Sequence, residues 1–426
     1  MCSSITPALN YVSRHARALA IQYTAPMTNP TLHTDIAIIG GGVAGLWALN
    51  QLRNRGYSAL LFEHQALGSD QTIASQGMIH GGIKYALGGN LNAGTEAIAA
   101  MPEAWRHCLA GDGAVDLRGC RVLSEEFYLW STGSLGSRLG SFFASKILRG
   151  RVEPLAQPDY PAPLRHADFG GQVYRLVDLV LDVPSLLETL AERHRQSIFN
   201  IDWHQASLQQ VSGKARLVLP QCTVEPQCLL LTAGAGNATL LQQLGASSPA
   251  MQRRPLQQVL VKHQYQEPLF AHCMGNSTSP RLTISSHRTR QGEPVWYLGG
   301  DLATAGNGES SQQLIAKARQ ELAQLLPWID LGHSEWRTLS LDRAEVKQAG
   351  LLRPDTAFVA PAEGIDNALV AWPTKLTLCP QLGDAIEAQL QDRQIYPHYQ
   401  PQPQLLALQD LGHPPIATPC WDTLFQ

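Results

Sequence analysis

Three glycines in the segment 40–45 and one acidic residue, Glu63, have the types and spacing of a dinucleotide-binding site. Gly40, Gly42 and Gly45 occupy the glycine places of the pattern G-x-G-x-x-G. Glycine lets a backbone turn tightly and approach a pyrophosphate, whose charge is stabilised by the N–H groups at the start of the following helix. An acidic residue about 20 residues further on accepts hydrogen bonds from ribose hydroxyls, and Glu63 is our candidate for that role.

The elements that must hold these residues occur in the required order. The apolar run 36–39 predicts a buried parallel strand, the leucine spacing over 46–52 predicts a helix, and the apolar run 59–62 predicts a second strand that ends at Glu63. Strand, glycine turn, helix, strand and acid together predict binding of an adenine dinucleotide. The alternative is a glycine-rich loop in an ordinary α/β domain.

Length and composition set bounds on the rest of the chain. Its 426 residues are enough for two domains, and 44% of them are hydrophobic. The formal net charge is −3, so nothing indicates nucleic acid as a partner. Its eight cysteines include no C-x-x-C pair, which is typical neither of a zinc site nor of a secreted disulfide framework. We therefore expect a cytoplasmic protein without a metal site. No apolar run is long enough to span a bilayer.

The nucleotide-binding domain is predicted to be discontinuous. A buried strand at 228–231 and another at 368–372 would join the strands of the first unit. We therefore assign residues 35–100, 168–245 and 355–395 to one Rossmann-like domain of the α/β class.

The remaining segments predict a second domain of the α+β class. Alternating polar and apolar residues over 255–302 are typical of antiparallel strands, so we assign 101–167 and 246–354 to a domain built on a mixed, largely antiparallel sheet. Residues 1–34 are expected to be a disordered extension or the product of an upstream start codon. Residues 396–426 are expected to form a C-terminal tail.

The order of these pieces resembles the D-amino acid oxidase superfamily of flavoproteins from residue 35 to about residue 390. Besides the first glycine motif, the segment 231–236, Leu-Thr-Ala-Gly-Ala-Gly, is similar to the strand end at which that family meets its cofactor again. The segment 372–383, Trp-Pro-Thr-Lys-Leu-Thr-Leu-Cys-Pro-Gln-Leu-Gly, looks like its C-terminal flavin segment. The resemblance implies FAD, bound extended, rather than NAD. We expect this FAD to be held without a covalent link.

The candidate FAD contacts come from all of these segments. They are Gly40, Gly42, Val43, Ala44, Gly45, Glu63, His64, Thr72, Ser75, Gln76, Gly77, Met78, Ala206, Ala233, Gly234, Lys375, Leu376 and Thr377.

The C-terminal segment has electrostatic reasons to face the flavin. A helix that starts near Pro380 points its positive end at whatever precedes it, and a reduced flavin carries negative charge. The helix end and Lys375 would stabilise that charge. The alternative for Lys375 is a solvated surface lysine, and Cys379 is expected to be a buried thiol rather than a flavin attachment point.

His80 is a candidate catalytic residue. The segment 71–85 resembles a region of the 2-hydroxyglutarate and glycerol-3-phosphate dehydrogenases that carries an I-H-x-G pattern. His80 would then lie at the flavin face, act as the base for an alcohol substrate, or carry a covalent flavin as in dimethylglycine dehydrogenases; a packing histidine is the fourth interpretation. A base is chemically sensible because an imidazole pKa of about 6.5 lets it accept a hydroxyl proton as hydride leaves carbon.

Arg353 is the candidate substrate-binding residue. The segment 350–354, Gly-Leu-Leu-Arg-Pro, resembles the G-L-R-P of glycine oxidase-like enzymes, whose arginine binds the substrate carboxylate. A guanidinium suits that role because it binds a carboxylate with two parallel hydrogen bonds. The D-G-x-P that usually follows is absent here, and Arg343 is a competitor. Either arginine could instead form a structural ion pair.

The segment 127–152 contains no acidic residue but several basic ones, and apolar residues fall at helical spacing within it. Residues 138–151 could therefore form an interfacial helix in weak peripheral contact with an anionic membrane, which would suit reduction of a membrane quinone. A helix packed over the second domain is the alternative.

Together these features predict an FAD-dependent oxidoreductase. It would take hydride from a C–H bond beside an amine or hydroxyl of a small anionic substrate, such as an amino acid, hydroxy acid or polyol phosphate. Oxygen or a quinone would receive the electrons. The His80 region favours a hydroxyl substrate and Arg353 favours an amino acid. The rivals are a flavin monooxygenase, a nucleic-acid-modifying flavoprotein and a non-enzymatic flavin-binding protein.

Overall fold

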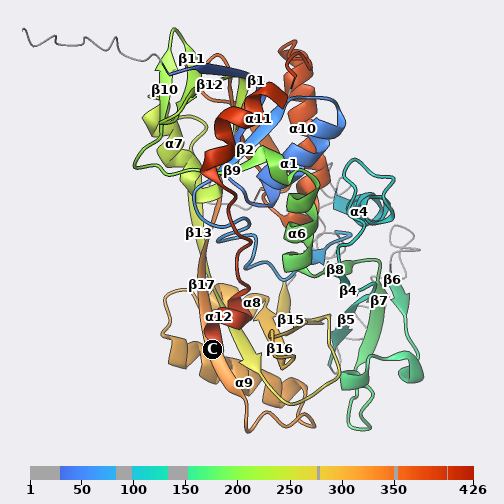
Figure 1. Cartoon of the computed structure of the whole chain (residues 1–426). Helices are drawn as coiled ribbons and strands as arrows, with labels where there is room; N and C mark the ends of the chain where they lie inside the picture. The colour runs from blue at the N-terminus through green and yellow to red at the C-terminus, as the bar shows by residue number, and fades with distance from the viewer. Residues whose placement is uncertain (1–28, 83–97, 133–151, 276–278, 350–353, 401) are drawn as a thin grey trace, which may run out of the picture.

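The structure is a computed structural model that describes residues 29–82, 98–132, 152–275, 279–349, 354–400 and 402–426. Two lobes lie one above the other in Figure 1, and the long strands β13 and β17 run from one lobe into the other. Arg353 and the segment 138–151, to which the sequence gives possible roles, lie outside the described residues, as do residues 83–85 of the segment 71–85.

The upper lobe contains the predicted Rossmann-like sheet. Five of its eight strands are parallel, and their order is β19-β12-β1-β2-β9. The hairpin β10-β11 pairs with the start of β12, and β18 pairs with β19. The strand bounds are β1 (Thr31–Ile39), β2 (Ala59–Glu63), β9 (Ile198–Asn200), β10 (Ser207–Val211), β11 (Lys214–Val218), β12 (Thr223–Leu231), β18 (Phe358–Pro361) and β19 (Ala368–Trp372). The central strands are continuous apolar runs because both of their faces are covered.

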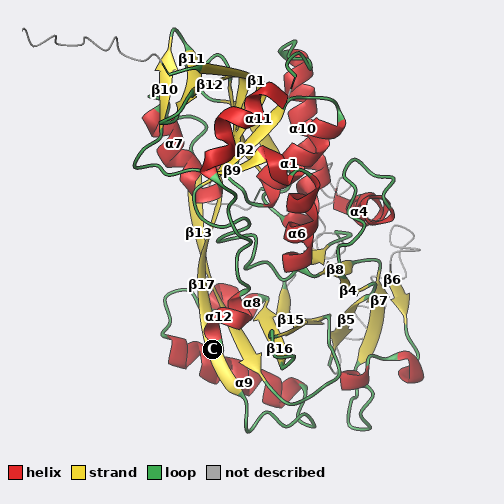
Figure 2. Cartoon of the chain, in the orientation of Figure 1, coloured by secondary structure: helices red, strands yellow, loops and turns green. Residues whose placement is uncertain are grey.

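Helices cover one face of this sheet, as Figure 2 shows. They are α1 (Val43–Asn54), α6 (Val183–Arg193) and α10 (Cys379–Asp392). A further helix, α4 (Met101–Ala110), packs against α10. Their apolar sides share one core, in which the rings of Trp47 and Trp105 lie 4.8 Å apart. The helix α7 (Asn237–Gln243) packs on the opposite face with β10 and β11. Helix α4 thus packs with the helices of the upper lobe, although we assigned 101–167 to the second domain from the sequence. The domain boundaries stay a prediction.

The lower lobe is built on the predicted mixed, largely antiparallel sheet. Its strand order is β17-β13-β16-β15-β14-β5-β7-β6, and only the pair β14–β5 is parallel among the described strands. The bounds are β5 (Phe127–Ser131), β6 (Val152–Pro154), β7 (Gln172–Leu176), β13 (Met251–Lys262), β14 (Ala271–Met274), β15 (Pro280–Arg288), β16 (Pro294–Gly299) and β17 (Glu335–Val346).

Two helices and a small third sheet complete the two lobes. Helix α9 (Ser311–Leu325) buries its apolar stripe against the lower sheet, and α8 (Asp301–Ala305) precedes it. Ser310 begins α9 with a capping box, in which its hydroxyl accepts the N–H of Gln313. The third sheet joins β3 (Met78–Ile79), β8 (Leu179–Leu181) and β4 (Val122–Ser124).

The C-terminal segment crosses from the upper to the lower lobe (Figure 1). After α11 (Gln402–Leu408) it forms a parallel bridge between Ile416 and Leu67. It ends in α12 (Cys420–Leu424), where the Trp421 ring stacks on His287 at 4.2 Å. Residues 396–426, which we expected to form a tail, therefore pack against both lobes.

One expectation about the N-terminal region needs correction. Residues 1–34 were expected to be disordered or misassigned, but β1 begins at Thr31 and its first residue pairs with Thr223 of β12. Residues 31–34 therefore belong to the sheet, because the strand continues beyond the apolar run that revealed it.

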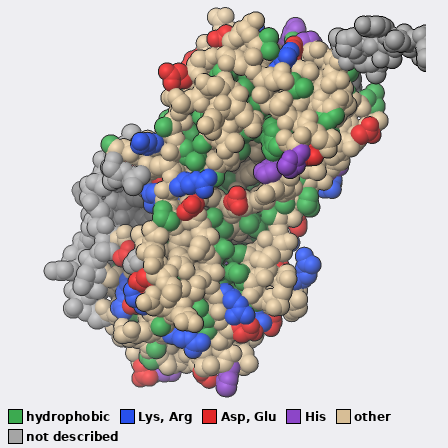
Figure 3. Space-filling model, turned by 90° about the vertical axis from the view of Figure 1, so that its left-hand side faces the viewer, with side chains coloured by type: hydrophobic (Ala, Val, Ile, Leu, Met, Phe, Trp, Pro, Cys, Tyr) green, Lys and Arg blue, Asp and Glu red, His purple; other side chains and the backbone are tan. Residues whose placement is uncertain are grey.

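The described residues include no helix that could span a membrane, and the face seen in Figure 3 carries charges of both signs. In the parts of the chain that the structure describes, no helix combines the length and the apolarity needed to cross a membrane. Acidic and basic side chains are interspersed on the face seen in Figure 3.

Candidate active site

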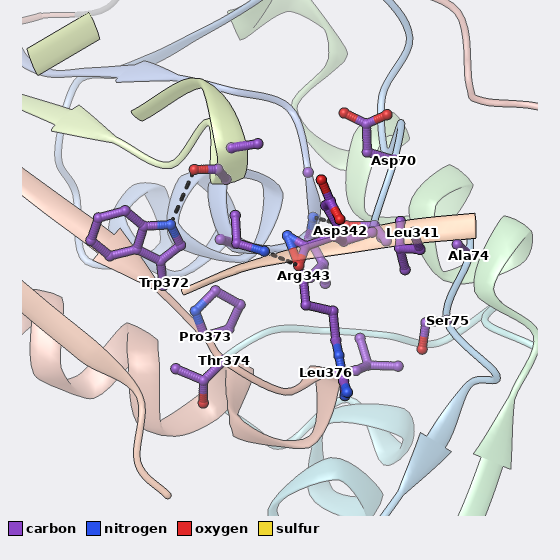
Figure 4. A pocket seen from close by; sticks show the side chains of 18 of the residues that line it. Asp70, Ala74, Ser75, Leu341, Asp342, Arg343, Trp372, Pro373, Thr374 and Leu376 are labelled. Carbon is purple, nitrogen blue, oxygen red and sulfur yellow. Dashed lines mark hydrogen bonds between the residues drawn. The ribbon is translucent and has the colours of Figure 1, made fainter. Parts of the chain in front are cut away.

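A cavity of about 1170 Å³ lies where the two lobes meet. The glycine turn after β1 and the segment after β19 line it from the upper lobe, and β13 and β17 line it from the lower lobe. Figure 4 shows Trp372, Pro373, Thr374 and Leu376 on one side and the β17 residues on another. The space is large enough for an extended cofactor, since ligand sites commonly measure about 300–1,000 Å³.

The glycines of this turn serve two different purposes: some are required by packing within the fold, and one leaves space for a ligand. Gly40 has φ +112°, and a Cβ built on it would lie 2.6 Å from the Cα of Ala233. A Cβ on Gly45 would lie 1.9 Å from the carbonyl oxygen of Gly40. A Cβ on Gly42, however, would meet only the hydroxyl of Thr72, at 3.4 Å. Gly40 and Gly45 are therefore required by packing, whereas at Gly42 the missing side chain leaves cavity space that a pyrophosphate would fill.

Glu63 is held at the end of β2 with its carboxylate in this cavity. One oxygen accepts the backbone N–H of Gly41 at 2.6 Å, and the other accepts those of His64 and Gln65 at 2.8 and 2.9 Å. The residue is 8% exposed, and its partners fix the carboxylate beside the glycine turn. Since each oxygen has two lone pairs, these bonds are compatible with a ribose hydroxyl as a further donor.

The second predicted cofactor-binding segment, 231–236, also contributes to the cavity wall. Ala233 and Gly234 follow β12, and the Trp372 indole N–H donates to the carbonyl of Gly234 at 3.1 Å (Figure 4). The amide oxygen of Asn237 accepts the N–H of Ala233 at 2.8 Å. This backbone is therefore fixed from both sides.

The segment after β19 brings a buried cation to the cavity. Lys375, Leu376 and Thr377 line the cavity directly before α10, which begins at Cys379. Lys375 is 7% exposed, so the alternative of a solvated surface lysine is wrong. Its ammonium lies 3.7 Å from the carboxylate of Asp355. A cation and a helix N-terminus at one place fit the negative charge of a reduced flavin.

Cys379 is a packing residue, as expected. It is fully buried in the core beneath α1 and α10, and burial raises the pKa of its thiol. It is not among the residues that line the cavity.

His80 lines the cavity and is held by residues from other segments. Its backbone N–H donates to the hydroxyl of Thr377 at 3.1 Å, and its Nδ1 lies 3.4 Å from the Asp178 carboxylate. Its ring lies 5.9 Å from the ring of His272, with 19° between the planes. Both histidines line the cavity, so two imidazoles meet at one part of its wall.

Most of the predicted FAD contacts share this one cavity. The ones that line it are Gly40, Gly42, Val43, Ala44, Glu63, His64, Thr72, Ser75, Gln76, Met78, Ala233, Gly234, Lys375, Leu376 and Thr377. Their contact with FAD stays a prediction.

Three predicted contacts lie elsewhere. Gly45 and Gly77 are neighbours in sequence of lining residues but serve packing: a Cβ on Gly77, at φ +74°, would lie 2.0 Å from the carbonyl oxygen of Leu181. Ala206 is buried in the core on the opposite face of the upper sheet. None of the three lines the cavity.

Two arginines line the cavity within the described residues, Arg253 of β13 and Arg343 of β17, and Arg343 is the competitor of Arg353. It extends from β17 into the cavity (Figure 4). Neither His272 nor Asp178 was predicted from the sequence. The only local signal for Asp178 is one acid between the apolar residues Val177 and Leu179.

Comparisons with known proteins show the family of this chain. The family model described as "DAO: FAD dependent oxidoreductase" matches residues 35–370. A "probable FAD-dependent oxidoreductase" of Pseudomonas aeruginosa is 48% identical over 395 residues, which cover 92% of this chain and 99% of that protein. The crystal structure of that protein matches with a TM-score of 0.80 and 43% identity, over 93% of this chain and 99% of that one.

More distant solved structures share the fold. A glycine oxidase from Geobacillus kaustophilus matches with a TM-score of 0.58 and 17% identity, over 87% of this chain and 98% of that one. An FAD-bound L-α-glycerophosphate oxidase from Mycoplasma pneumoniae matches with a TM-score of 0.61 and 13% identity, over 84% and 95%.

Proposed function

The chain belongs to the DAO family of FAD-dependent oxidoreductases, and we propose that it oxidises a small anionic substrate at a C–H bond beside an amine or hydroxyl group. The observation that carries this proposal is that Arg343 and His80 line the same cavity as the glycine turn. One residue can bind an anion and the other can accept a proton.

FAD fits the residues of the upper lobe. Gly42 would leave room for the pyrophosphate, Glu63 would accept the ribose hydroxyls, and Lys375 with the start of α10 would face the flavin. When bound, FAD supplies the acceptor for the hydride. The residues of the lower lobe are then left to hold the substrate.

Arg343 supports an anionic substrate. A guanidinium binds carboxylate or phosphate oxygens with two parallel charge-assisted hydrogen bonds. Amino acids, hydroxy acids and polyol phosphates all present such a group. Arg343 would therefore select for a negative charge on the substrate and would not distinguish an amine from a hydroxyl. His80 would serve a hydroxyl substrate as the base that removes its proton.

The electron acceptor and the location are part of the same proposal. We expect oxygen or a quinone to receive the electrons, in the cytoplasm. The seven cysteines within the described residues are free thiols, which supports a reducing compartment. The weak membrane contact of residues 138–151 stays a prediction.

Anaerobic flavin bleaching tests the proposal. Amino acids, hydroxy acids and polyol phosphates would be added to the FAD-loaded protein, each beside an uncharged analogue. At least one anionic class should bleach the flavin, and its uncharged analogue should not. Bleaching by both members of a pair, or by no compound, would contradict the proposal.

The role of His80 is tested with the substrate so found. In FAD-loaded His80→Ala, loss of a base should slow flavin reduction by about 10²- to 10⁴-fold, measured by stopped flow. A rate within about threefold of the wild type is too small a change for a lost base and would exclude this role.

A further inference from the structure

A buried carboxylate lies behind His80. Asp178 stands between β7 and β8 and is 3% exposed. One of its oxygens, Oδ1, accepts the backbone N–H of Gly81 at 2.7 Å. The other, Oδ2, lies 3.4 Å from Nδ1 of His80, which is a long hydrogen bond. Each carboxylate oxygen therefore faces a nitrogen of the His80–Gly81 segment.

We propose that Asp178 is a positioning residue that keeps the proton of His80 on Nδ1 and leaves Nε2 able to accept one. A carboxylate only accepts hydrogen bonds, so Nδ1 must be the donor in this contact. A neutral imidazole carries one N–H, so its Nε2 is then an acceptor. The catalytic meaning of this tautomer rests on the proposed function, in which His80 is the base.

The proton and electrons of that step balance. The substrate hydroxyl proton moves to Nε2 while the hydride leaves the neighbouring carbon for the bound FAD, and the product is a carbonyl compound. His80 becomes an imidazolium, whose positive charge the Asp178 carboxylate stabilises. Asp178 itself keeps its charge throughout.

Neighbouring groups restrict how the ring and the carboxylate can turn. A Cβ on Gly81 would lie 2.9 Å from the Val177 side chain and 3.0 Å from Oδ1 of Asp178, so glycine allows the backbone N–H to reach the carboxylate. The nearly parallel ring of His272 lies on one side of His80, and its own Nδ1 lies 2.8 Å from the hydroxyl of Thr283. The His80 ring thus has a nearly parallel ring on one side and the Asp178 carboxylate at its Nδ1.

The substitution Asp178→Asn tests whether Asp178 sets the tautomer of His80. The Gly81 N–H is a fixed donor, so it will retain the amide oxygen of an asparagine. The amide NH₂ then faces Nδ1 of His80, which must become the acceptor. The ring is driven to the tautomer with its proton on Nε2, which cannot take a proton from the substrate.

The measurement is the tautomer itself, from ¹⁵N-histidine correlation spectra of the FAD-loaded protein. The spectrum of His80→Gln assigns the His80 signals. Asp182→Asn is the matched control, because Asp182 is also buried and close in sequence but pairs with Arg121 instead. We expect protonated Nδ1 in the wild type and in the Asp182→Asn variant, and protonated Nε2 in Asp178→Asn.

Flavin reduction provides the second readout. Asp178→Asn should keep its FAD but slow reduction by a hydroxyl substrate by about 10²- to 10⁴-fold, as expected for a lost base. Protonated Nε2 in the wild type, or an unchanged tautomer in Asp178→Asn, would overturn the assignment. If Asp178→Asn does not fold, the wild-type spectrum still tests the assignment, because it shows which His80 nitrogen carries the proton. A switched tautomer in a protein that no substrate reduces would support the positioning and count against the proposed function.

Discussion

Gly45 lies so close to Gly40 that a Cβ atom on Gly45 would stand 1.9 Å from the Gly40 carbonyl oxygen. This contact closes the turn between β1 and α1 within the protein itself. Gly42, three residues before Gly45, has no such neighbour, because its missing side chain faces the cavity. Two glycines of one motif therefore serve different purposes, and substitution can tell them apart.

Gly42→Val should fold normally and bind no FAD. The new side chain enters the cavity where the pyrophosphate is expected, and the nearest protein atom to its Cβ is a hydroxyl oxygen at 3.4 Å. The visible flavin spectrum and the far-UV circular dichroism of the purified variant check this. Gly45→Val should instead lose stability, and Gly170→Ala should change neither property, since nothing lies within 4 Å of its Cβ. A full flavin spectrum in Gly42→Val would disprove the motif assignment.

The flavin should be dissociable. Cys379 cannot reach it, because this thiol is fully buried outside the cavity lining, and His80 is engaged by Asp178. Acid precipitation should therefore leave a colourless pellet and a yellow supernatant. A yellow pellet, with flavin found on the His80 peptide by mass spectrometry, would show a covalent link.

Arg343→Gln should weaken the binding of an anionic substrate without loss of FAD. Hydrogen bonds to charged groups contribute about 1.5–3 kcal/mol, so the substrate dissociation constant should rise about 10- to 100-fold. It is measured from the concentration dependence of anaerobic bleaching. Arg337→Gln is the control, because Arg337 lies on the same strand but donates to the carbonyl of Leu424 outside the cavity. Equal effects of the two substitutions would argue against a substrate contact.

His263 should make the protein less stable in mild acid. Burial lowers the pKa of His263 to about 4, whereas in the unfolded chain it is about 6.5. Between these values the unfolded chain binds a proton that the folded protein excludes, so stability falls as the pH falls below about 6.5. From about pH 7 to about pH 5 the loss from this residue is about 2 kcal/mol.

His263→Leu should remove that part of the loss. Urea denaturation of the wild type and the variant at both pH values gives the comparison. If the two proteins lose the same free energy of unfolding, His263 does not titrate in this way.

The sequence predicted those parts of the site that depend on local patterns. The glycine turn and Glu63 fall within 30 residues of chain, and each is read from its neighbours. Lys375 was found through a resemblance of twelve residues, 372–383, although only the structure shows that it is buried.

The missed residues depend on contacts between distant segments. Asp178 and His272 stand 98 and 192 residues after His80, and no local pattern joins them. The presence of Arg343 in the cavity depends on the long pairing of β13 with β17, which carries its strand up to the other lobe. The position of α4 depends on a core that it shares with α1, so its place in the upper lobe could not be predicted from local sequence patterns either.

The position of β19 beside β12 has a consequence for the synthesis of the chain. The strand β1 ends at Ile39, but β19, which completes the cavity wall, begins at Ala368. At about 5–20 residues per second, a ribosome needs about 16 to 66 seconds to cover the distance between them. During that time the glycine turn exists without its partner segment, so the nascent chain can acquire its cofactor only near the end of translation.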